Sequence, residues 1–103
     1  MNNREKLSNL IGLAQRAGKV ISGEELVIKA IQSGKAQLIF LANDAGANLT
    51  KKTADKCQYY KIEVSTVFNT LELSAALGKP RKVVAIADAG FFKENEDSYE
   101  LKE

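Results

Sequence analysis

The sequence predicts an α/β domain in which helices cover both faces of one central sheet. Residues 38–42 and 83–87 are continuous apolar runs, which are typical of strands buried on both faces. Segments with the apolar spacing of helices alternate with these runs, and only short connectors separate them. The chain has 103 residues, the length of one ordinary domain, which leaves no room for a second core.

The first helix is predicted over residues 4–17. Gly18 follows at a position where helices commonly end, and residues 19–21 form a short extended segment. The apolar residues of this helix have the spacing that places them on one face. They are Leu7, Leu10, Ile11, Ala14 and Ala17.

A second helix is predicted to begin at Ser22. The Ser22 hydroxyl would cap it, because Glu25 follows at the spacing of a capping box. Gly34 is expected to end this helix. The predicted buried stripe consists of Leu26, Val27, Ala30 and Ile31.

Residues 43–46, after the first buried strand, have the chemistry of a turn. The helix predicted to follow carries Leu49, Thr53, Cys57 and Tyr60 along one side. Residues 62–66 then alternate in polarity and predict a half-buried strand. Ile62, Val64 and Thr66 would face inward, and Glu63 and Ser65 would face outward.

Asn69 and Glu72 predict a capped start for the next helix, and Gly78 is expected to end it. Its apolar residues are Leu73, Ala76 and Leu77. Beyond the second buried strand, Phe91 and Phe92 are expected in a short helix or turn packed on the sheet. We expect residues 1–92 to form the domain and residues 93–103 to form a peripheral acidic tail.

The composition excludes most enzyme classes. The chain has no histidine, so it cannot build a Ser-His-Asp triad, a Cys-His pair or an imidazole metal site. Cys57 is the single cysteine, and one thiol without imidazole cannot hold a structural zinc ion. We therefore expect a protein that is not an enzyme and that uses no metal or cofactor.

The same composition suits the cytoplasm. The single thiol forms no internal disulfide, as expected for a reducing compartment, and Cys57 is predicted to be a small buried hydrophobe. The apolar runs at 38–42 and 83–87 fall far short of the ~20 residues that a membrane-spanning helix needs. The first six residues are polar and are not followed by a long apolar segment, so they are not a secretory signal. We expect a cytoplasmic monomer with no membrane partner.

The formal net charge of +2 conceals an asymmetry along the chain. Residues 1–88 contain 13 Lys and Arg against 8 Asp and Glu, whereas residues 89–103 contain 2 against 5. The body is therefore basic (+5) and the tail acidic (−3). A basic body suits a polyanionic partner, although many of these side chains would do no more than solvate helix surfaces.

The densest basic cluster is Lys79-Pro80-Arg81-Lys82, between a helix end and a buried strand. Pro80 limits the conformations of this loop, so less entropy is lost when it engages a ligand. Its cations could neutralise phosphates, which would make binding weaker at high salt. The alternative is a solvated loop with no partner.

A second candidate site lies at the start of the second helix, at Gly23, Glu24 and Glu25. The first N–H groups of a helix lack partners within it, so they can receive a phosphate or a base edge. Lys29 could join Lys19 and Arg16 in a cationic rim around this start. The competing interpretations are structural: acidic residues stabilise a helix start, and Glu25 with Lys29 has the spacing of an ion pair.

Tyr59 and Tyr60 are also open to two interpretations. They could stack on bases, or they could belong to the core or its rim at a junction between a helix and a strand.

Several motifs together resemble one family. They begin with Arg16-Ala17-Gly18-Lys19-Val20-Ile21-Ser22-Gly23, followed by Lys29-Ala30-Ile31, Gly34 and residues 38–42. The likeness continues through Asp44, Cys57, Ile62, Leu73, Gly78 and residues 83–87. This pattern resembles the kink-turn-binding ribosomal proteins of the large subunit (the L-seven-Ae family), and more closely its small bacterial YlxQ-type branch.

The resemblance implies a three-layer α/β/α sandwich around a mixed four-stranded sheet, with no catalytic activity. It also implies that the second helix reads sheared G·A pairs of a kinked RNA through an Asn-Glu pair and a later Lys. Aligned without gaps on Lys29, these two positions are Glu25 and Leu26. A shift of one residue makes the pair Glu24 and Glu25 instead.

In that family the loop after the Gly78-like glycine packs apolar residues against an extruded nucleotide, whereas the loop here is basic. The resulting hypothesis is a non-catalytic protein that binds kinked or bulged structured RNA, of the ribosome or of another ribonucleoprotein. Its contacts would be Arg16, Lys19, Gly23, Glu24, Glu25, Lys29, Lys79, Pro80, Arg81 and Lys82. The alternative is a module of the same fold that has lost RNA binding and contacts a ribosomal or assembly protein.

Overall fold

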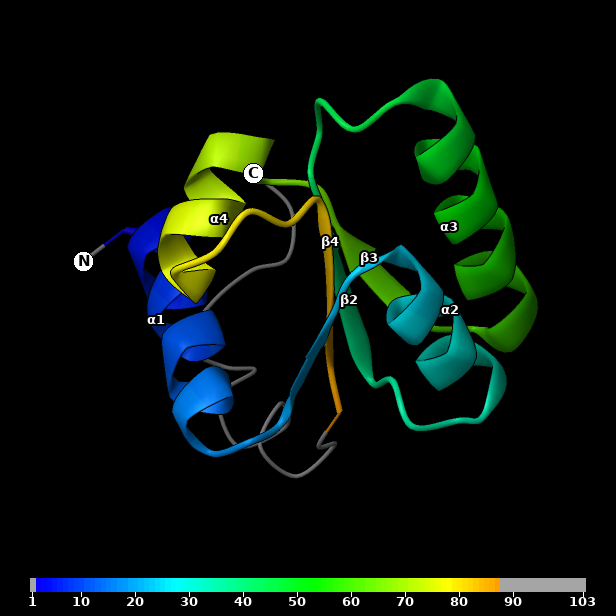
Figure 1. Ribbon diagram of the computed structural model, residues 1–103, viewed down its shortest axis with the longest axis horizontal. Helices are drawn as coiled ribbons and strands as arrows, with labels where there is room; N and C mark the ends of the chain where they lie inside the picture. The colour runs from blue at the N-terminus through cyan, green and yellow to red at the C-terminus, as the bar shows by residue number, and fades with distance from the viewer. Residues whose placement is uncertain (1, 88–103) are drawn as a thin grey trace.

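The computed structural model describes residues 2–87. The described chain alternates helices and strands throughout (Figure 1). In order they are α1 (Asn3–Arg16), β1 (Val20–Ser22), α2 (Glu24–Gln32), β2 (Leu38–Leu41), α3 (Ala47–Tyr60), β3 (Glu63–Ser65), α4 (Thr70–Leu77) and β4 (Val83–Ile86). The predicted packing of Phe91 and Phe92 and the predicted acidic tail lie outside the described residues.

The strands form one mixed sheet in the order β1-β4-β2-β3. β4 pairs antiparallel with both β1 and β2, whereas β3 runs parallel to β2. Figure 1 shows α1 and α4 against one face of this sheet and α2 and α3 against the other. The predicted α/β architecture, with three layers and a mixed four-stranded sheet, is confirmed.

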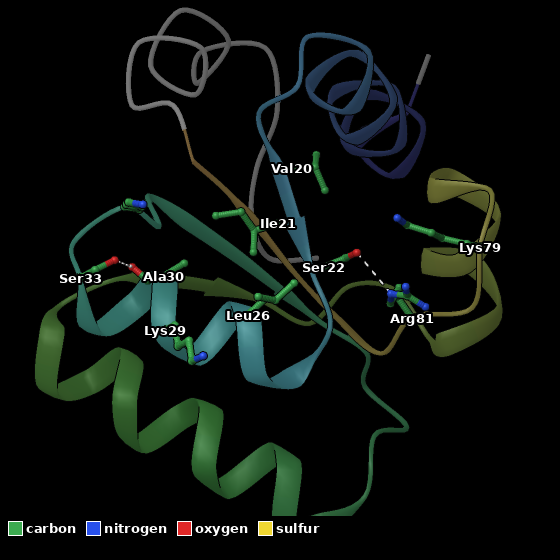
Figure 2. A pocket seen from close by; sticks show the side chains of 10 residues that line it. Val20, Ile21, Ser22, Leu26, Lys29, Ala30, Ser33, Lys79 and Arg81 are labelled. Carbon is green, nitrogen blue, oxygen red and sulfur yellow. Dashed lines mark hydrogen bonds between the residues drawn. The ribbon is translucent and has the colours of Figure 1, made fainter.

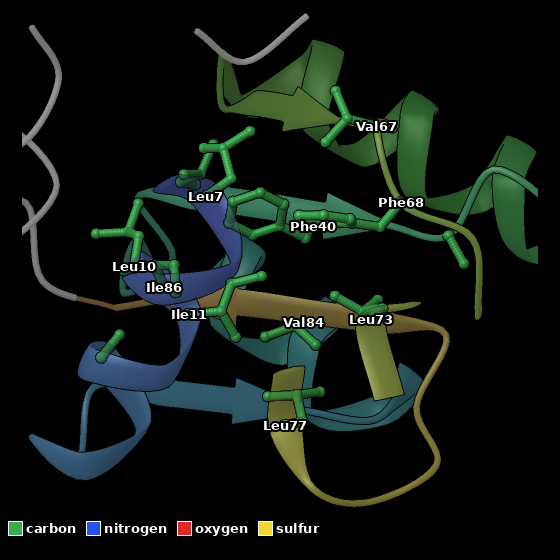
Figure 3. Packing of buried hydrophobic residues seen from close by; sticks show 13 residues of the cluster. Leu7, Leu10, Ile11, Phe40, Val67, Phe68, Leu73, Leu77, Val84 and Ile86 are labelled. Atoms are coloured by element: carbon green, nitrogen blue, oxygen red, sulfur yellow. The ribbon is translucent and has the colours of Figure 1, made fainter. Parts of the chain in front are cut away.

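The two central strands supply both halves of the core. Every residue of β2 and β4 is buried, as the apolar runs predict. Because neighbouring strand residues point to opposite faces, Phe40 and Val84 pack toward α1 and α4 (Figure 3), while Ile39 and Ala85 pack toward α2 and α3. Cys57 lies in the second cluster and is 2% exposed, so its prediction as a buried hydrophobe is confirmed.

Two of the helices begin with a side-chain cap. The Asn2 side chain accepts a hydrogen bond from the Glu5 backbone N–H at the start of α1. At the start of α4, Asn69 and Glu72 form the predicted capping box. The Glu72 carboxylate also forms an ion pair with Arg4, which ties α4 to α1.

The prediction that Ser22 caps the second helix is wrong. Ser22 is the last residue of β1 and is paired with Val84 of β4. The cap of α2 is Gly23, whose φ of 97° suits glycine, and it supplies no side-chain hydrogen bond. Sheet pairing holds Ser22 in the strand, so the capping-box spacing to Glu25 is not used.

The predicted buried stripe of α2 is also partly wrong. Val27, Ala30 and Ile31 are buried, but Leu26 is 58% exposed and Ile28 is buried in its place. Which face of α2 packs on the sheet depends on the direction in which the helix leaves β1. The apolar spacing alone does not determine that direction.

The second strand of the parallel pair departs from its predicted alternation. β3 ends at Ser65, which is buried, whereas Thr66 is exposed. Because helices cover both faces of the sheet, neither face of β3 meets solvent at Ser65. On the side of α3 that carries Cys57, Thr53 is also buried, whereas Tyr60 at the end of the helix is 40% exposed.

No helix within residues 2–87 combines the length and the apolar character needed to span a membrane. In the same part of the chain, no three His, Cys, Asp or Glu side chains gather in a way that could hold a metal ion.

Candidate nucleic-acid interface

The sheet brings the start of α2 next to the basic loop, which we define as residues 79–82. The antiparallel pairing of β1 with β4 puts the end of β1 beside the beginning of β4. The Gly23 backbone N–H accordingly donates to the Val83 carbonyl at 3.3 Å. Two segments that are remote in sequence therefore form one edge of the molecule.

Arg81 joins the two segments through its side chain. Its Nε donates a hydrogen bond to the Ser22 Oγ at 3.2 Å, shown as a dashed line in Figure 2. The Arg81 backbone N–H in turn donates to the Ser74 hydroxyl of α4 at 3.0 Å. Arg81 is half-buried between these partners, so it holds the basic loop against both α4 and the end of β1.

A groove runs between β1, α2 and the basic loop (Figure 2). Its apolar lining includes Ile21 and the exposed Leu26, and its four cationic lining residues come from both segments. These cations are Lys29, Lys35, Lys79 and Arg81. We define the cationic edge as Ser22, Gly23, Lys29, Lys79, Arg81 and Lys82. Lys35 lies at the other end of the groove, because the Gln37 N–H just after it donates to the Ile86 carbonyl at the end of β4. Neither Leu26 nor Lys35 was among the predicted contacts. Leu26 was expected in the buried stripe, although it aligns with the glutamate position of the family, and only the turn after α2 brings Lys35 back to the groove.

A second hollow adjoins the first on the other side of Arg81. It is lined by residues from the beginnings of three helices and from the basic loop: Gly23, Glu24, Leu49, Thr70, Pro80, Arg81, Lys82 and Val83. Helix starts carry a partial positive charge and unpaired N–H donors. At α4 the N–H groups of Thr70 and Glu72 already donate to Asp44 and Asn69, so the starts of α2 and α3 are the ones that leave donors for an anion beside the three loop residues.

The helix starts at this edge differ in how they are capped. Gly46 caps α3 and Gly23 caps α2, and neither helix has a side-chain cap hydrogen bond. By contrast, asparagine side chains cap α1 and α4. The first N–H donors of α2 and α3 are therefore left for solvent or a ligand.

Acidic groups share the same edge. Glu24 and Glu25 are exposed in the first turn of α2. The hydroxyl and the backbone N–H of Thr70 donate to the Asp44 carboxylate at 2.6 and 2.8 Å. These bonds lower the pKa of Asp44, and the nearby positive charge of Lys82 lowers it further. Carboxylates therefore lie among the cations of this edge. An anion can bind there only at positions away from these carboxylates.

The structure does not bring Arg16 and Lys19 to this edge. The Lys19 carbonyl accepts a hydrogen bond from Ala87 N–H, past the end of β4 that is remote from Gly23. Arg16 lines a different hollow, between α1 and α4. The predicted rim is thus divided: Lys29 lies with the basic loop, whereas Arg16 and Lys19 lie at the opposite end of the sheet.

The fold and the cationic edge define a small three-layer α/β protein with an anion-receptive sheet edge. The chain belongs to the ribosomal protein L7Ae/L30e/S12e/Gadd45 family, whose model matches residues 5–101. The resemblance to the L-seven-Ae family found in the sequence motifs is thereby confirmed.

Several relatives are similar over most of their length. A protein of Enterococcus faecium described as RNA-binding protein YlxQ is 49% identical over 98 residues, which cover 95% of each chain. A Bacillus subtilis protein of the same description is also 49% identical, over 80% of this chain and 83% of that protein.

Solved structures agree with the fold. A protein of unknown function from Bacillus halodurans is 44% identical, covers 89% of this chain and 93% of its own, and superposes with a TM-score of 0.81. A Giardia lamblia protein described as a 15.5kD RNA-binding protein is 19% identical, with a TM-score of 0.75 over 89% of this chain and 86% of its own. At that identity the second likeness concerns the fold alone.

Proposed function

We propose that this chain is a non-catalytic RNA-binding protein that grips kinked or bulged RNA at the cationic edge. The observation that carries the proposal is the Arg81–Ser22 hydrogen bond, because it joins the basic loop to the start of α2 in one surface. The family and the RNA-binding relatives support the same conclusion.

Each part of the edge has a role in this proposal. Lys79 and Lys82 neutralise phosphates, and Pro80 restricts the loop that carries them. The uncapped N–H groups after Gly23 donate to phosphate or base edges. Lys29 lines the same groove from the last turn of α2. A regular A-form helix hides its base edges, so this arrangement suits RNA whose kink exposes them.

Glu24 and Glu25 give the edge its selectivity in this proposal. A carboxylate accepts hydrogen bonds from guanine N–H groups and repels phosphate. Regular duplex RNA presents phosphates to the edge, whereas a kinked loop presents base donors. The two carboxylates therefore weaken the binding of duplex RNA more than the binding of kinked RNA. We place the protein on the ribosome or another ribonucleoprotein, where such kinked RNA occurs.

The deciding experiment is a titration of kink-turn RNA against a plain duplex of equal length. We expect at least a tenfold preference for the kinked RNA, and equal affinities would remove the proposal. Binding of a basic ribosomal or assembly protein in place of both RNAs would favour a protein-interaction module instead.

Two double variants test whether RNA binds at the cationic edge. Lys79→Gln with Lys82→Gln should weaken binding and lower the slope of log affinity against log salt by about 0.7–0.9 for each lost phosphate contact. The matched control is Lys6→Gln with Arg16→Gln, which removes the same charge from two exposed positions on α1 away from the edge. If both pairs have the same effect, RNA binding does not use this edge.

A further inference from the structure

The end of α3 carries two exposed aromatic side chains that the cationic edge does not use. Tyr59 is 78% exposed and Tyr60 is 40% exposed. Their ring centroids lie 4.8 Å apart with the ring planes at 71°, an edge-to-face contact. Within residues 2–87 neither hydroxyl has a hydrogen-bond partner in the structure, so packing and hydrogen bonding in this part of the chain do not account for the pair.

The ring contact has a physical consequence. Edge-to-face aromatic pairs stabilise one another, so each ring restricts the rotation of its neighbour. A flat ring that is both exposed and held in place loses little entropy when another aromatic ring stacks on it. The pair is therefore a preorganised stacking surface.

Lysines lie along α3, between its start at the cationic edge and the tyrosine pair at its end. Lys52, Lys56 and Tyr59 are spaced by four and three residues, so they share one flank of α3. Lys61 follows at the helix cap. Asp55 shares this flank, three residues after Lys52 and four before Tyr59, and Glu63 follows the helix, so three lysines and two carboxylates lie near the tyrosines in the sequence.

The two surfaces lie at opposite ends of one helix. Leu49, in the first turn of α3, lines the hollow beside the basic loop, whereas the tyrosines end the helix. The 14 residues of α3 span about 21 Å at 1.5 Å per residue. That length equals about six stacked nucleotides at 3.4 Å per step.

We propose that Tyr59 and Tyr60 stack on an unpaired nucleotide of the RNA that the cationic edge holds, with Lys52 and Lys56 following the strand between the two sites. This inference rests on the proposed function. Every base has a π-face, so stacking adds affinity for a flanking single strand without demanding a sequence. Phosphates along the strand match the lysines of the flank.

The test compares two RNAs: a kink-turn trimmed to its paired core, and the same core with a single-stranded extension of about eight nucleotides. The extension should tighten binding of the unaltered protein about tenfold, within the range of one stacked base. Tyr59→Ala should abolish this gain, and Tyr59→Phe should keep it. Leu71→Ala, at an equally exposed apolar residue on α4, is the matched control and should leave the gain intact.

The outcomes separate this inference from the proposed function. If the trimmed RNA binds but the extension adds nothing, or if the gain survives Tyr59→Ala, the stacking surface is refuted and the proposed function stands. If the trimmed RNA does not bind, the proposed function fails, and a titration with the single-stranded extension alone tests the stacking surface. Binding of this oligonucleotide that is lost in Tyr59→Ala supports stacking. Binding that is unchanged in Tyr59→Ala refutes it. Equal Tyr59-dependent binding of a polyglutamate peptide would identify a protein contact and overturn the proposal.

Discussion

The Nε of Arg81 donates a hydrogen bond of 3.2 Å to the Oγ of Ser22 and connects residues that lie 59 positions apart in the sequence. One partner belongs to the basic loop and the other ends the strand that leads into α2. The contact therefore fixes the distance between the two halves of the cationic edge.

Ser22→Ala tests this contact without changing any charge. We expect RNA affinity to fall several-fold, because Arg81 loses the partner that orients it. A double-mutant cycle with Arg81→Ala should give a coupling energy of about 0.5–1.5 kcal/mol in unfolding measurements, the usual range for a hydrogen bond. Fully additive effects on unfolding and on RNA affinity would show that strand pairing alone, and not this side-chain contact, positions the two halves.

Glu24→Gln combined with Glu25→Gln should tighten RNA binding at low salt. The change removes phosphate repulsion at the start of α2 and keeps an acceptor oxygen at each position. The gain should be larger for plain duplex than for kink-turn RNA, and it should shrink above about 0.5 M salt because exposed charges are screened. Titrations of both RNAs at two salt concentrations measure this.

The same two substitutions should also lower stability. Each carboxylate interacts with the positive end of α2, a stabilisation of about 0.3–1 kcal/mol. Glu5→Gln is the control for RNA binding, because it removes an exposed first-turn carboxylate from α1, away from the edge. Weaker RNA binding by the double variant at low salt would mean that the carboxylates are attractive contacts.

The stability of the fold should fall in acid through Glu72. The Arg4 side chain and the Asn69 N–H both donate to its carboxylate, and they lower its pKa in the folded state below the ordinary value of 4.5. The stabilisation is therefore complete above pH 4.5 and is lost as the pH falls through the lowered pKa. Urea unfolding across this range should show a shallower pH dependence in Glu72→Gln than in the unaltered protein.

Asn69→Ala should remove the cap of α4 at neutral pH. Loss of a side-chain cap costs about 0.5–2 kcal/mol of unfolding free energy. Unfolding measured by circular dichroism tests the value. Ser33→Ala provides a control, because Ser33 follows α2 and caps no helix start. Equal stability of Asn69→Ala and the unaltered protein would contradict the capping box.

Thr53→Val should stabilise the protein. The Thr53 hydroxyl is fully buried in α3 and has no hydrogen-bond partner in the structure among residues 2–87. Valine keeps the shape and removes the unsatisfied group, whose burial costs about 1–3 kcal/mol. The melting temperature should rise by several degrees, whereas Thr53→Ser, which keeps the hydroxyl, should not raise it.

The elements that could be predicted from the sequence are those with local causes. The Asn69–Glu72 capping box depends on residues within one turn, so its spacing was sufficient. The apolar runs of β2 and β4 identify strands buried on both faces, because no other strand environment tolerates them. The family motifs extended this to the three layers and the mixed sheet.

The wrong predictions concern residues whose local sequence favours one structure and whose contacts with remote parts of the chain impose another. Ser22 has the spacing of a helix cap, but its pairing with Val84 of β4 keeps it in β1. Leu26 has helical spacing, yet the direction in which α2 leaves the sheet exposes it and buries Ile28.

By itself, the sequence determined the alternation of helices and strands, the two buried strands, the lack of histidine chemistry and the family. These follow from residue type and short-range spacing. Only the tertiary structure decided which cations lie together: antiparallel pairing of β1 with β4 puts the basic loop beside Gly23 and leaves Arg16 and Lys19 at the other end. The physical reason is that strand pairing joins residues by position in the sheet, and no local pattern encodes that position.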